Sequence, residues 1–244
     1  MQRPSVFAVL LTLVGVGVFC ALGVWQLDRA AYKQTVLARF DHAAAAPLES
    51  LAHALSDPAP NDYPHVEVGG HFEGDRVYFL DNQMRAGRLG VMVFVPFVPD
   101  GSARALLVNL GFLAKMGADS TTLPDVPPIP AGEVSLTGIY APPPLPGLKL
   151  GGNPLGRQAT WPKLVTWIDT GEIGADLHRK VYPHVLLLDP DPHSAYLRHW
   201  TANVMPPARH RAYALQWFSF ALAAIVMFFV LHRPRRGEAV TEEE

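Results

Sequence analysis

The stretch PSVFAVLLTLVGVGVFCALGVWQL, residues 4–27, contains no charged residue, and neither does the stretch AYALQWFSFALAAIVMFFVL, residues 212–231. At about 1.5 Å per helical residue, each is long enough to cross a hydrocarbon core roughly 30 Å thick. Aromatic residues stand near one end of each stretch, Trp25 in the first and Tyr213 and Trp217 in the second. Such residues favour the level of the lipid headgroups. The sequence therefore predicts two transmembrane helices.

The first stretch could instead be a cleaved signal peptide. It exceeds the hydrophobic region of such peptides, which is roughly 7–15 residues long, and no small-residue cleavage site follows it. The chain continues directly into Trp25-Gln26-Leu27-Asp28-Arg29. We therefore expect an uncleaved anchor. Because the residues before Val6 are too few for a transit peptide, we expect the inner (plasma) membrane of a bacterium rather than an organelle.

The short tails indicate the orientation. Arg3 precedes the first stretch, and Arg233, Arg235 and Arg236 follow the second. Positive residues near the ends of a span favour the cytoplasmic side, so we expect a multi-pass protein with both termini in the cytoplasm. The chain then divides into a transmembrane helix at 4–27, an extracytoplasmic domain at 28–211, a second helix at 212–231 and a cytoplasmic tail at 232–244.

The middle of the chain is predicted to be mainly β, in an α+β fold. Residues 28–40 have helical composition and extend the first helix, and the alanine-rich range 43–55 favours a second short helix. Segments rich in β-branched and aromatic residues, bounded by Gly, Pro and Asp, predict strands at 63–72, 76–80, 90–98, 104–113, 133–140, 164–168 and 184–188. Pro99-Asp100-Gly101-Ser102 is typical of a hairpin turn. Residues 91–98 are apolar on both faces, which indicates a buried strand.

Composition excludes several classes of protein. The chain has 244 residues, of which 17% are charged, and a net charge of −2, so it lacks the basic excess of a nucleic-acid binder. One cysteine, Cys20, excludes disulfide frameworks, iron–sulfur ligation and covalently attached haem. No nucleophile–base pair or hydrolase, zinc-protease or nucleotide-binding motif is present, so we expect no enzyme. Asp189, Asp191 and His193 alternate with prolines and could hold a metal, but Asp-Pro repeats more often mark turns.

The predicted outer ends of the two helices carry the most distinctive residues. Trp25, Arg29 and Lys33 would share one helix face, as would His210, Tyr213, Ala214 and Trp217. Gln26 and Gln216 lie in apolar sequence, so we expect them at similar depth, hydrogen-bonded across a packed helix pair. Gly17 and Ala21 are small residues that would let the two backbones approach. The simplest interpretation is that the aromatic and basic residues anchor the helices at the membrane surface.

These ends also carry a family resemblance. The pattern G-x-W-Q-x-x-R-x-x-x-K at 23–33 and the pattern H-x-x-Y-A-x-Q-W-F at 210–218 resemble the surfeit locus protein 1 family. The middle of the chain agrees in order, with Tyr63 and Gly70-His71-Phe72, then Leu107-Val108-Asn109-Leu110-Gly111-Phe112, then 161–169. Leu110 and Phe112 stand where the family has Arg and Trp, and Ala208-Arg209 where it commonly has Asn-Asn.

The resemblance implies an assembly factor, or chaperone, in respiratory-chain biogenesis. It would assist delivery of haem a to the catalytic subunit of haem–copper cytochrome c oxidase, or stabilise the haem there. A histidine of the second helix is the implied iron ligand, and His210 matches it, with Tyr213 and Trp217 beside it. The partners implied are the catalytic subunit, the haem a synthesis machinery and the lipid bilayer. Trp25, Gln26, Arg29 and Gln216 are the other residues of the motif. The alternative is a membrane-anchored scaffold that binds oxidase subunits without binding haem.

Overall fold

The computed structural model describes residues 5–57, 63–117, 122–146, 152–202 and 204–233. Arg3, Arg235, Arg236 and most of the predicted tail at 232–244 lie outside these residues. The chain divides into two compact units, one formed by Met1–Leu37 with Val204–Glu244 and the other by Ala38–Asn203. We call them the helix unit and the sheet unit. Two apolar helices thus flank a mixed α and β domain, which confirms the predicted architecture at this level.

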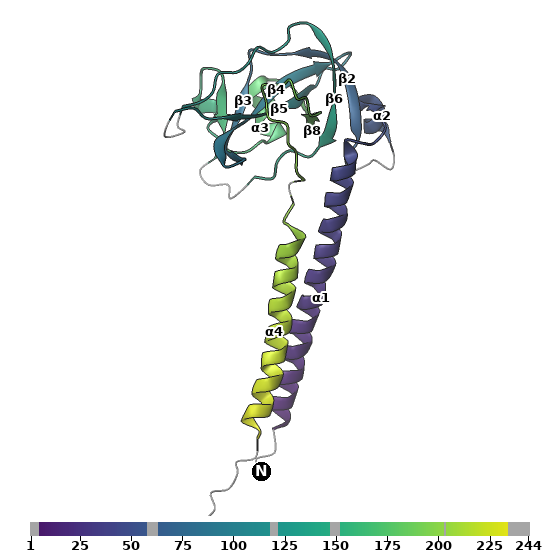
Figure 1. Ribbon diagram of the computed structural model, residues 1–244, viewed down its shortest axis with the longest axis vertical. Coiled ribbons are helices and arrows are strands. Elements are labelled where there is room, and N and C mark those ends of the chain that lie inside the picture. The colour runs from purple at the N-terminus through teal and green to yellow at the C-terminus, as the bar shows by residue number, and fades with distance from the viewer. Residues whose placement is uncertain (1–4, 58–62, 118–121, 147–151, 203, 234–244) are drawn as a thin grey trace, which may run out of the picture. The chain divides into compact units, whose positions relative to one another are not determined.

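The helix unit contains most of α1 (Val6–Ala43) and all of α4 (Pro207–Leu231). Both helices are long and apolar enough to cross a membrane, by length and composition. In their most apolar stretches only 6% and 11% of the residues are buried, so neither resembles the core helix of a soluble protein. Within this unit the two helices run antiparallel, side by side (Figure 1). α1 continues through the predicted extension at 28–40.

The helix predicted at 43–55 is wrong for most of its length. α1 ends at Ala43, and a turn leads through Pro47 to the two-residue strand β1 (Glu49–Ser50). Helix α2 begins only afterwards (Leu51–Ser56), and the Oγ of Ser50 caps it by accepting a hydrogen bond from the backbone N–H of His53. Proline has no N–H and disfavours a helical preceding residue, so alanine-rich composition does not carry the helix through this point.

The sheet unit is built on one eight-stranded sheet. After β1 its strands are β2 (His65–Phe72), β3 (Tyr78–Arg85), β4 (Arg88–Pro99), β5 (Ala105–Ala114), β6 (Glu133–Ala141), β7 (Lys163–Val165) and β8 (Val181–Leu188). They lie in the order β1-β2-β6-β8-β5-β4-β3-β7. All seven predicted strands are present, although β3 and β8 are longer than predicted and β7 is shorter. The predicted turn joins β4 to β5, with the N–H of Ser102 donating to the carbonyl of Pro99.

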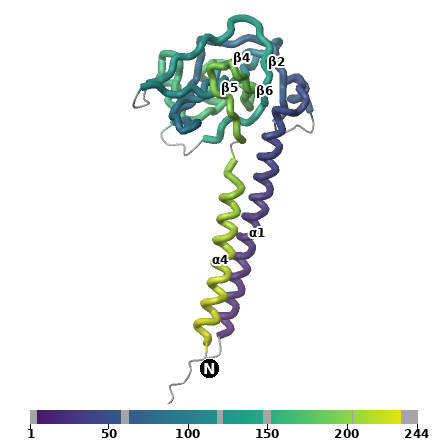
Figure 2. Tube along the Cα trace, viewed as in Figure 1, coloured from purple at the N-terminus to yellow at the C-terminus, as the bar shows by residue number. Residues whose placement is uncertain are grey.

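A further pairing closes part of the sheet into a ring. β2 pairs with β6 from His65 to His71 and with β4 from Gly70 to Phe72, so β2, β6, β8, β5 and β4 form a closed circuit (Figure 2). Gly70 sits where β2 changes partner, with φ +152°. A Cβ atom there would lie 2.1 Å from the carbonyl oxygen of Val98. Only glycine allows this approach, which explains the glycine of the Gly70-His71-Phe72 motif.

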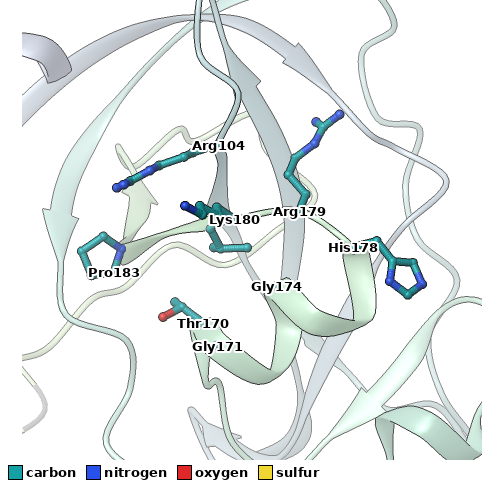
Figure 3. A pocket seen from close by; sticks show the side chains of 9 residues that line it. Arg104, Thr170, Gly171, Gly174, His178, Arg179, Lys180 and Pro183 are labelled. Carbon is teal, nitrogen blue, oxygen red and sulfur yellow. The ribbon is translucent and has the colours of Figure 1, made fainter.

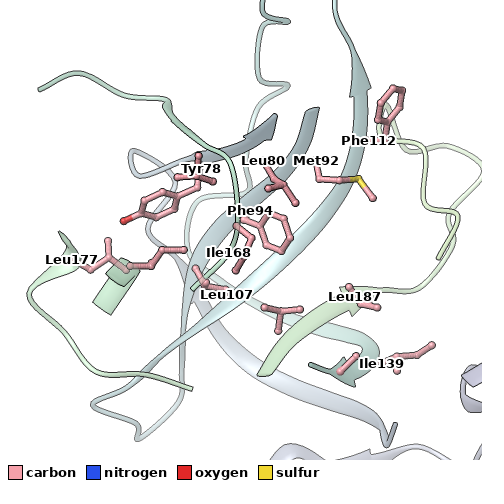
Figure 4. Close-up of a cluster of buried hydrophobic side chains, with 14 of the residues drawn as sticks. Tyr78, Leu80, Met92, Phe94, Leu107, Phe112, Ile139, Ile168, Leu177 and Leu187 are labelled. Atoms are coloured by element: carbon pink, nitrogen blue, oxygen red, sulfur yellow. The ribbon is translucent and has the colours of Figure 1, made fainter. Parts of the chain in front are cut away.

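Both faces of the sheet are buried. Consecutive residues of β8 alternate between two apolar clusters, with Val185 and Leu187 in one and Leu186 and Leu188 in the other. The first cluster packs Tyr78, Leu80 and Phe94 beside Ile168 and Leu177 (Figure 4). It also includes Phe40 and Ala43, from the last turns of α1. The prediction that 91–98 is buried on both faces is confirmed, with Val98 at its end only half-buried.

Helix α3 (Thr170–Leu177) was not predicted. Its N-terminus is capped by Asp169, whose carboxylate accepts hydrogen bonds from the N–H groups of Gly171 and Glu172 at 2.9 and 3.1 Å. The sheet unit covers fewer residues than the predicted domain at 28–211. Residues 28–37 and the residues from Val204 onward belong to the helix unit.

The Asn109-Leu110-Gly111 segment forms a bulge in β5. Val93 of β4 pairs with Gly111 and the next residue, Phe94, pairs with Asn109, so Leu110 is the extra residue. The buried side chain of Asn109 accepts a hydrogen bond from the N–H of Gly111 at 3.1 Å. Gly111 has φ +129°, and a Cβ atom there would lie 2.7 Å from the Cβ of Tyr196. Asn109 and Gly111 of the motif therefore stabilise the bulge in β5.

Candidate functional site between α1 and α4

The facing sides of α1 and α4 follow a spacing of three and four residues. The less exposed positions on α1 include Thr12, Val16, Phe19, Gly23, Gln26, Ala30, Lys33 and Leu37. Those on α4 include Pro207, His210, Ala214, Trp217, Phe218, Ala221, Ala224 and Phe228, and His232 follows as the C-cap. This spacing places one continuous stripe of each helix against its partner. Gly23, Ala30, Ala214 and Ala221 are small and buried, and small residues at such positions permit a close approach between helices.

The residues predicted to permit this approach are not the ones that do so. Gly17 and Ala21 are exposed, and a Cβ atom on Gly17 would meet nothing within 4 Å. Gly23 is the glycine that faces α4, because a Cβ atom there would lie 2.6 Å from two ring atoms of Phe218. The prediction was wrong because four-residue spacing alone does not identify which stripe of a uniformly apolar helix faces its neighbour.

His210 and Gln26 meet within this stripe. The Nδ1 atom of His210 lies 2.8 Å from the Oε1 atom of Gln26. The other ring nitrogen, Nε2, is buried and has no hydrogen-bond partner among the residues that the structure describes. A buried polar atom without a partner is costly and uncommon in folded proteins. This nitrogen is the chemically distinctive feature of the helix unit.

The predicted pairing of Gln26 with Gln216 is wrong. Gln216 is exposed, whereas Gln26 is bonded to His210, six residues earlier on α4. Six residues correspond to about 9 Å along a helix, so the two glutamines are not at the same depth. Position 216 also lies outside the three-and-four stripe that contains Ala214 and Trp217.

The other predicted site residues surround the pair at varying exposure. Trp217 faces α1, where its ring stacks on Phe19 at a centroid distance of 5.9 Å. Trp25, next in sequence to Gln26, is 52% exposed, and Tyr213, one helical turn from His210, is 45% exposed. Both therefore present aromatic surface outward. Arg29 is exposed, and its guanidinium carbon lies 5.9 Å from the centroid of the Tyr32 ring. A role of these residues in binding haem stays a prediction.

Four basic side chains occur near His210 and Gln26, namely Arg29, Lys33, Arg209 and Arg211. Arg211 donates a hydrogen bond to the Oε1 of Gln34 at 2.7 Å, and Lys33 lies 5.4 Å from the Tyr32 ring centroid. Within the described parts of the chain, none of the four forms an ion pair. Arg29, Arg209 and Arg211 are exposed.

Two polar clusters of the sheet unit, around His65 and around Asp176, are satisfied internally. His65 is buried, and its Nε2 lies 2.9 Å from Asp189, while its Nδ1 lies 3.1 Å from the carbonyl of Ala46. Tyr78 donates to the carboxylate of Asp176, which also pairs with Lys163 at 2.5 Å. Burial and Asp176 together raise the pKa of Tyr78 above its ordinary range. Each group already has its partner, so both clusters are structural.

The proline-rich D-P-D-P-H segment forms turns. Asp189 pairs with His65, and the Oδ1 of Asp191 accepts a hydrogen bond from the backbone N–H of His193 at 2.9 Å. Among the described residues, no group of three or more His, Cys, Asp or Glu side chains could hold a metal ion. The turn interpretation therefore accounts for this segment.

A basic hollow of about 780 Å³ lies beside α3. In Figure 3, Arg104 and Lys180 extend near Thr170, while Arg179 and His178 point away from them. Arg179 is paired with Glu73 at 2.8 Å. Because Arg104 and Lys180 are exposed and no buried group points to a ligand, the hollow has weaker chemical character than the His210 site.

Comparison with known proteins agrees with the resemblance seen in the sequence. The family model for the SURF1 family, the surfeit locus protein 1 family, matches residues 13–222. A search of curated proteins finds no match. The matched range covers most of the chain and includes both Gln26 and His210, together with the Gly70 crossing and the Asn109 bulge. The chain therefore belongs to the SURF1 family.

Proposed function

We propose that this protein assists the assembly of haem–copper cytochrome c oxidase by holding haem a through His210 while the catalytic subunit matures. The SURF1 family is generally linked to cytochrome c oxidase assembly, and the roles of haem a and of His210 follow from the resemblance described above. The observation that carries the proposal is the buried Nε2 of His210, which has no partner among the described residues.

The residues around His210 suit such a ligand. Neutral imidazole is a common axial ligand of haem iron, and His210 would hold the iron through Nε2. The haem propionates are anionic, and Arg29, Lys33, Arg209 and Arg211 could neutralise them through charge-assisted hydrogen bonds. Trp25 and Tyr213 expose aromatic surface for the apolar macrocycle. The bound haem would supply the redox chemistry of the finished oxidase, and this chain would supply only its binding.

The burial of Nε2 has a consequence for release. Protein atoms cover this nitrogen, so a ligand reaches it only when the covering side chains move. That rearrangement costs free energy and lowers the apparent affinity. A moderate affinity suits a protein that must pass its ligand to the catalytic subunit, or receive it from the haem a synthesis machinery, rather than keep it.

We also propose that α1 and α4 cross the membrane, with the sheet unit on the extracytoplasmic side and both termini in the cytoplasm. The apolar length of both helices and their small buried fraction support insertion. Arg233, Arg235 and Arg236 after α4 support the orientation. The His210 site then lies toward the extracytoplasmic end of the helix pair.

The test is purification of His210→Ala from cells that make haem a. We expect the variant to accumulate in the membrane at the wild-type level and to lose the Soret absorption that accompanies the wild-type protein. His232→Ala is the matched control, because His232 ends the same helix, roughly 33 Å away, and bonds locally to the carbonyl of Phe228. It should keep the full haem content.

The scaffold alternative predicts a different result. If His210→Ala keeps full haem occupancy, or if the wild-type protein carries no haem while still co-purifying with oxidase subunits, the haem proposal is wrong. The protein would then act by binding subunits alone.

A further inference from the structure

We propose that Gln26 is a positioning residue that fixes the neutral tautomer of His210. It holds the hydrogen on Nδ1 and leaves the lone pair of Nε2 free to bind a metal. The tautomer follows from the contacts in the helix unit alone. The identification of the metal as haem iron rests on the proposed function.

The hydrogen bond between the two side chains has two conceivable directions. In the first, the Nδ1–H of His210 donates to the Oε1 of Gln26, and Nε2 carries a lone pair. In the second, the amide group of Gln26 donates to Nδ1, and Nε2 carries a hydrogen. Because Nε2 is buried without a partner among the described residues, the second direction buries an N–H donor that has no acceptor. Orphaned donors are rarer than underused acceptors, and the structure places Oε1 against Nδ1 at 2.8 Å.

The packing around Gln26 restrains its side chain. Gly23 and Ala30, on either side of Gln26 in the α1 stripe, are both buried against α4. The ring of Phe218 fills the space over Gly23, and the amide side chain of Gln26 reaches the ring of His210. The amide that fixes the tautomer thus also restrains rotation of the ring, because a flip of the imidazole would break the 2.8 Å contact.

This arrangement has the form of an outer-shell interaction at a metal site. Histidines that bind metals usually donate their second ring N–H to an acceptor, which orients the ring and makes the metal-binding nitrogen more basic. Loss of such a partner typically lowers metal affinity about 10–100-fold. Gln26 would give His210 both properties before any ligand arrives.

The first test measures the tautomer without haem. The full-length protein is labelled with ¹⁵N-histidine and placed in lipid nanodiscs, and the His210 signals are identified by their absence in His210→Ala. We expect Nδ1 to give the signal of a protonated ring nitrogen and Nε2 that of an unprotonated one. Gln26→Leu removes the acceptor and should produce a mixture of tautomers. Gln26→Glu keeps an acceptor and should retain the wild-type pattern.

The matched control is Gln34→Leu, which removes another α1 amide that bonds to α4, in this case to Arg211. It should leave the His210 signals unchanged. This control shows whether a change in Gln26→Leu comes from loss of the Gln26 acceptor or from weaker packing of the two helices. A hydrogen found on Nε2 in the wild type, or a tautomer that does not respond to Gln26→Leu, would overturn the proposal.

The second test measures haem a in the purified variants. Gln26→Leu should lower haem affinity about 10-fold or more, and Gln26→Glu should keep the haem and lower its reduction potential, because an anionic acceptor makes the imidazole a stronger donor. Unchanged haem content and potential in both variants would contradict the positioning role. The two proposals fail separately: haem retained by His210→Ala overturns the proposed function, whereas the tautomer measurement in haem-free protein decides the role of Gln26.

Discussion

Asp176 holds together the buried polar cluster of the sheet unit. Its carboxylate accepts a hydrogen bond from Tyr78 at 2.9 Å and pairs with Lys163, and both side chains of the ion pair are only 11% exposed. Asp176→Asn would leave the Lys163 charge buried without a carboxylate. We expect the free energy of unfolding to fall by about 3 kcal/mol, as measured by guanidinium titration with tryptophan fluorescence.

The control for Asp176 is Glu73→Gln, which breaks the more exposed pair with Arg179. Such pairs contribute roughly 0–1 kcal/mol, so this variant should be close to wild type. Equal destabilisation by the two substitutions would contradict the argument from burial.

His65 should make the stability of the sheet unit depend on pH. Burial lowers the pKa of His65, but the hydrogen bonds to Asp189 and Ala46 and the charge of Asp189 together raise it above the ordinary value of 6.5. The folded state therefore binds the proton more tightly than the unfolded state. This contribution is fully present below about pH 6.5 and is lost as the pH rises through the folded pKa.

The matched variant is Asp189→Asn, which removes the charge and keeps a polar side chain. We expect the wild type to exceed it in melting temperature most at pH 5.5, with the difference shrinking toward pH 8.5. Thermal unfolding followed by circular dichroism across this range measures the difference. Parallel curves for the two proteins would show that His65 does not titrate in this way.

At the scale of single residues, the sequence identifies candidate site residues more reliably than it identifies their contact partners. His210 stands out because it matches a motif at the start of the second apolar stretch. Its hydrogen-bond partner Gln26 does not stand out. Gln26 and Gln216 are both glutamines near apolar sequence, and only the positions that face the other helix distinguish them. The three-and-four spacing of Gly23, Gln26 and Ala30 was the available signal, and it is weak in a helix that is apolar on every side.

At the scale of elements, the crossing of β2 between β6 and β4 depends on Gly70. Gly70→Ala would place a Cβ atom 2.1 Å from the carbonyl oxygen of Val98 and would force a side chain onto an unfavourable backbone conformation. We expect destabilisation of about 3 kcal/mol, the upper end of overpacking and strain costs. Guanidinium titration of the purified protein measures it.

The comparison for Gly70 is Gly156→Ala in the 3-10 helix η1 (Leu155–Arg157), where an added Cβ would meet nothing within 4 Å. It should change stability by no more than about 0.5 kcal/mol. A similar loss in both variants would indicate that the crossing of β2 is not the cause.

The stripe that joins α1 to α4 can be tested by crosslinking. In a Cys20→Ala background, Phe19→Cys with Trp217→Cys replaces two stacked rings whose centroids are 5.9 Å apart. We expect this pair to form an intramolecular crosslink with a short bifunctional reagent, seen as a mobility shift in gel electrophoresis. The control, Gly17→Cys with Trp217→Cys, uses an exposed α1 position and should not react within one chain. Equal reaction of both pairs would contradict the assignment of Phe19, rather than Gly17, to the side of α1 that faces α4.

Elements were predictable where local signals agree. The seven strands follow from β-branched and aromatic residues between turn signals, and the hairpin follows from Pro99 and Gly101. α3 was missed although Asp169 and Glu172 have the spacing of a helix start, because the segment is short and lies among strand-like residues. The closure of β2 onto β4 joins segments distant in sequence, and no local pattern indicates it.

At the scale of the whole chain, the predicted membrane topology is the remaining test. Two apolar helices that pack antiparallel place both termini on one side of a membrane if both insert, and Arg233, Arg235 and Arg236 after α4 favour the cytoplasm for that side. Alkaline phosphatase, which folds actively only outside the cytoplasm, should be active when fused after Ser102 and inactive when fused after Val240. Replacing the three arginines with serine should raise the activity of the Val240 fusion, because the charge that retains this end is lost. Activity at Val240 with none at Ser102 would reverse the orientation and move the His210 site to the cytoplasmic surface.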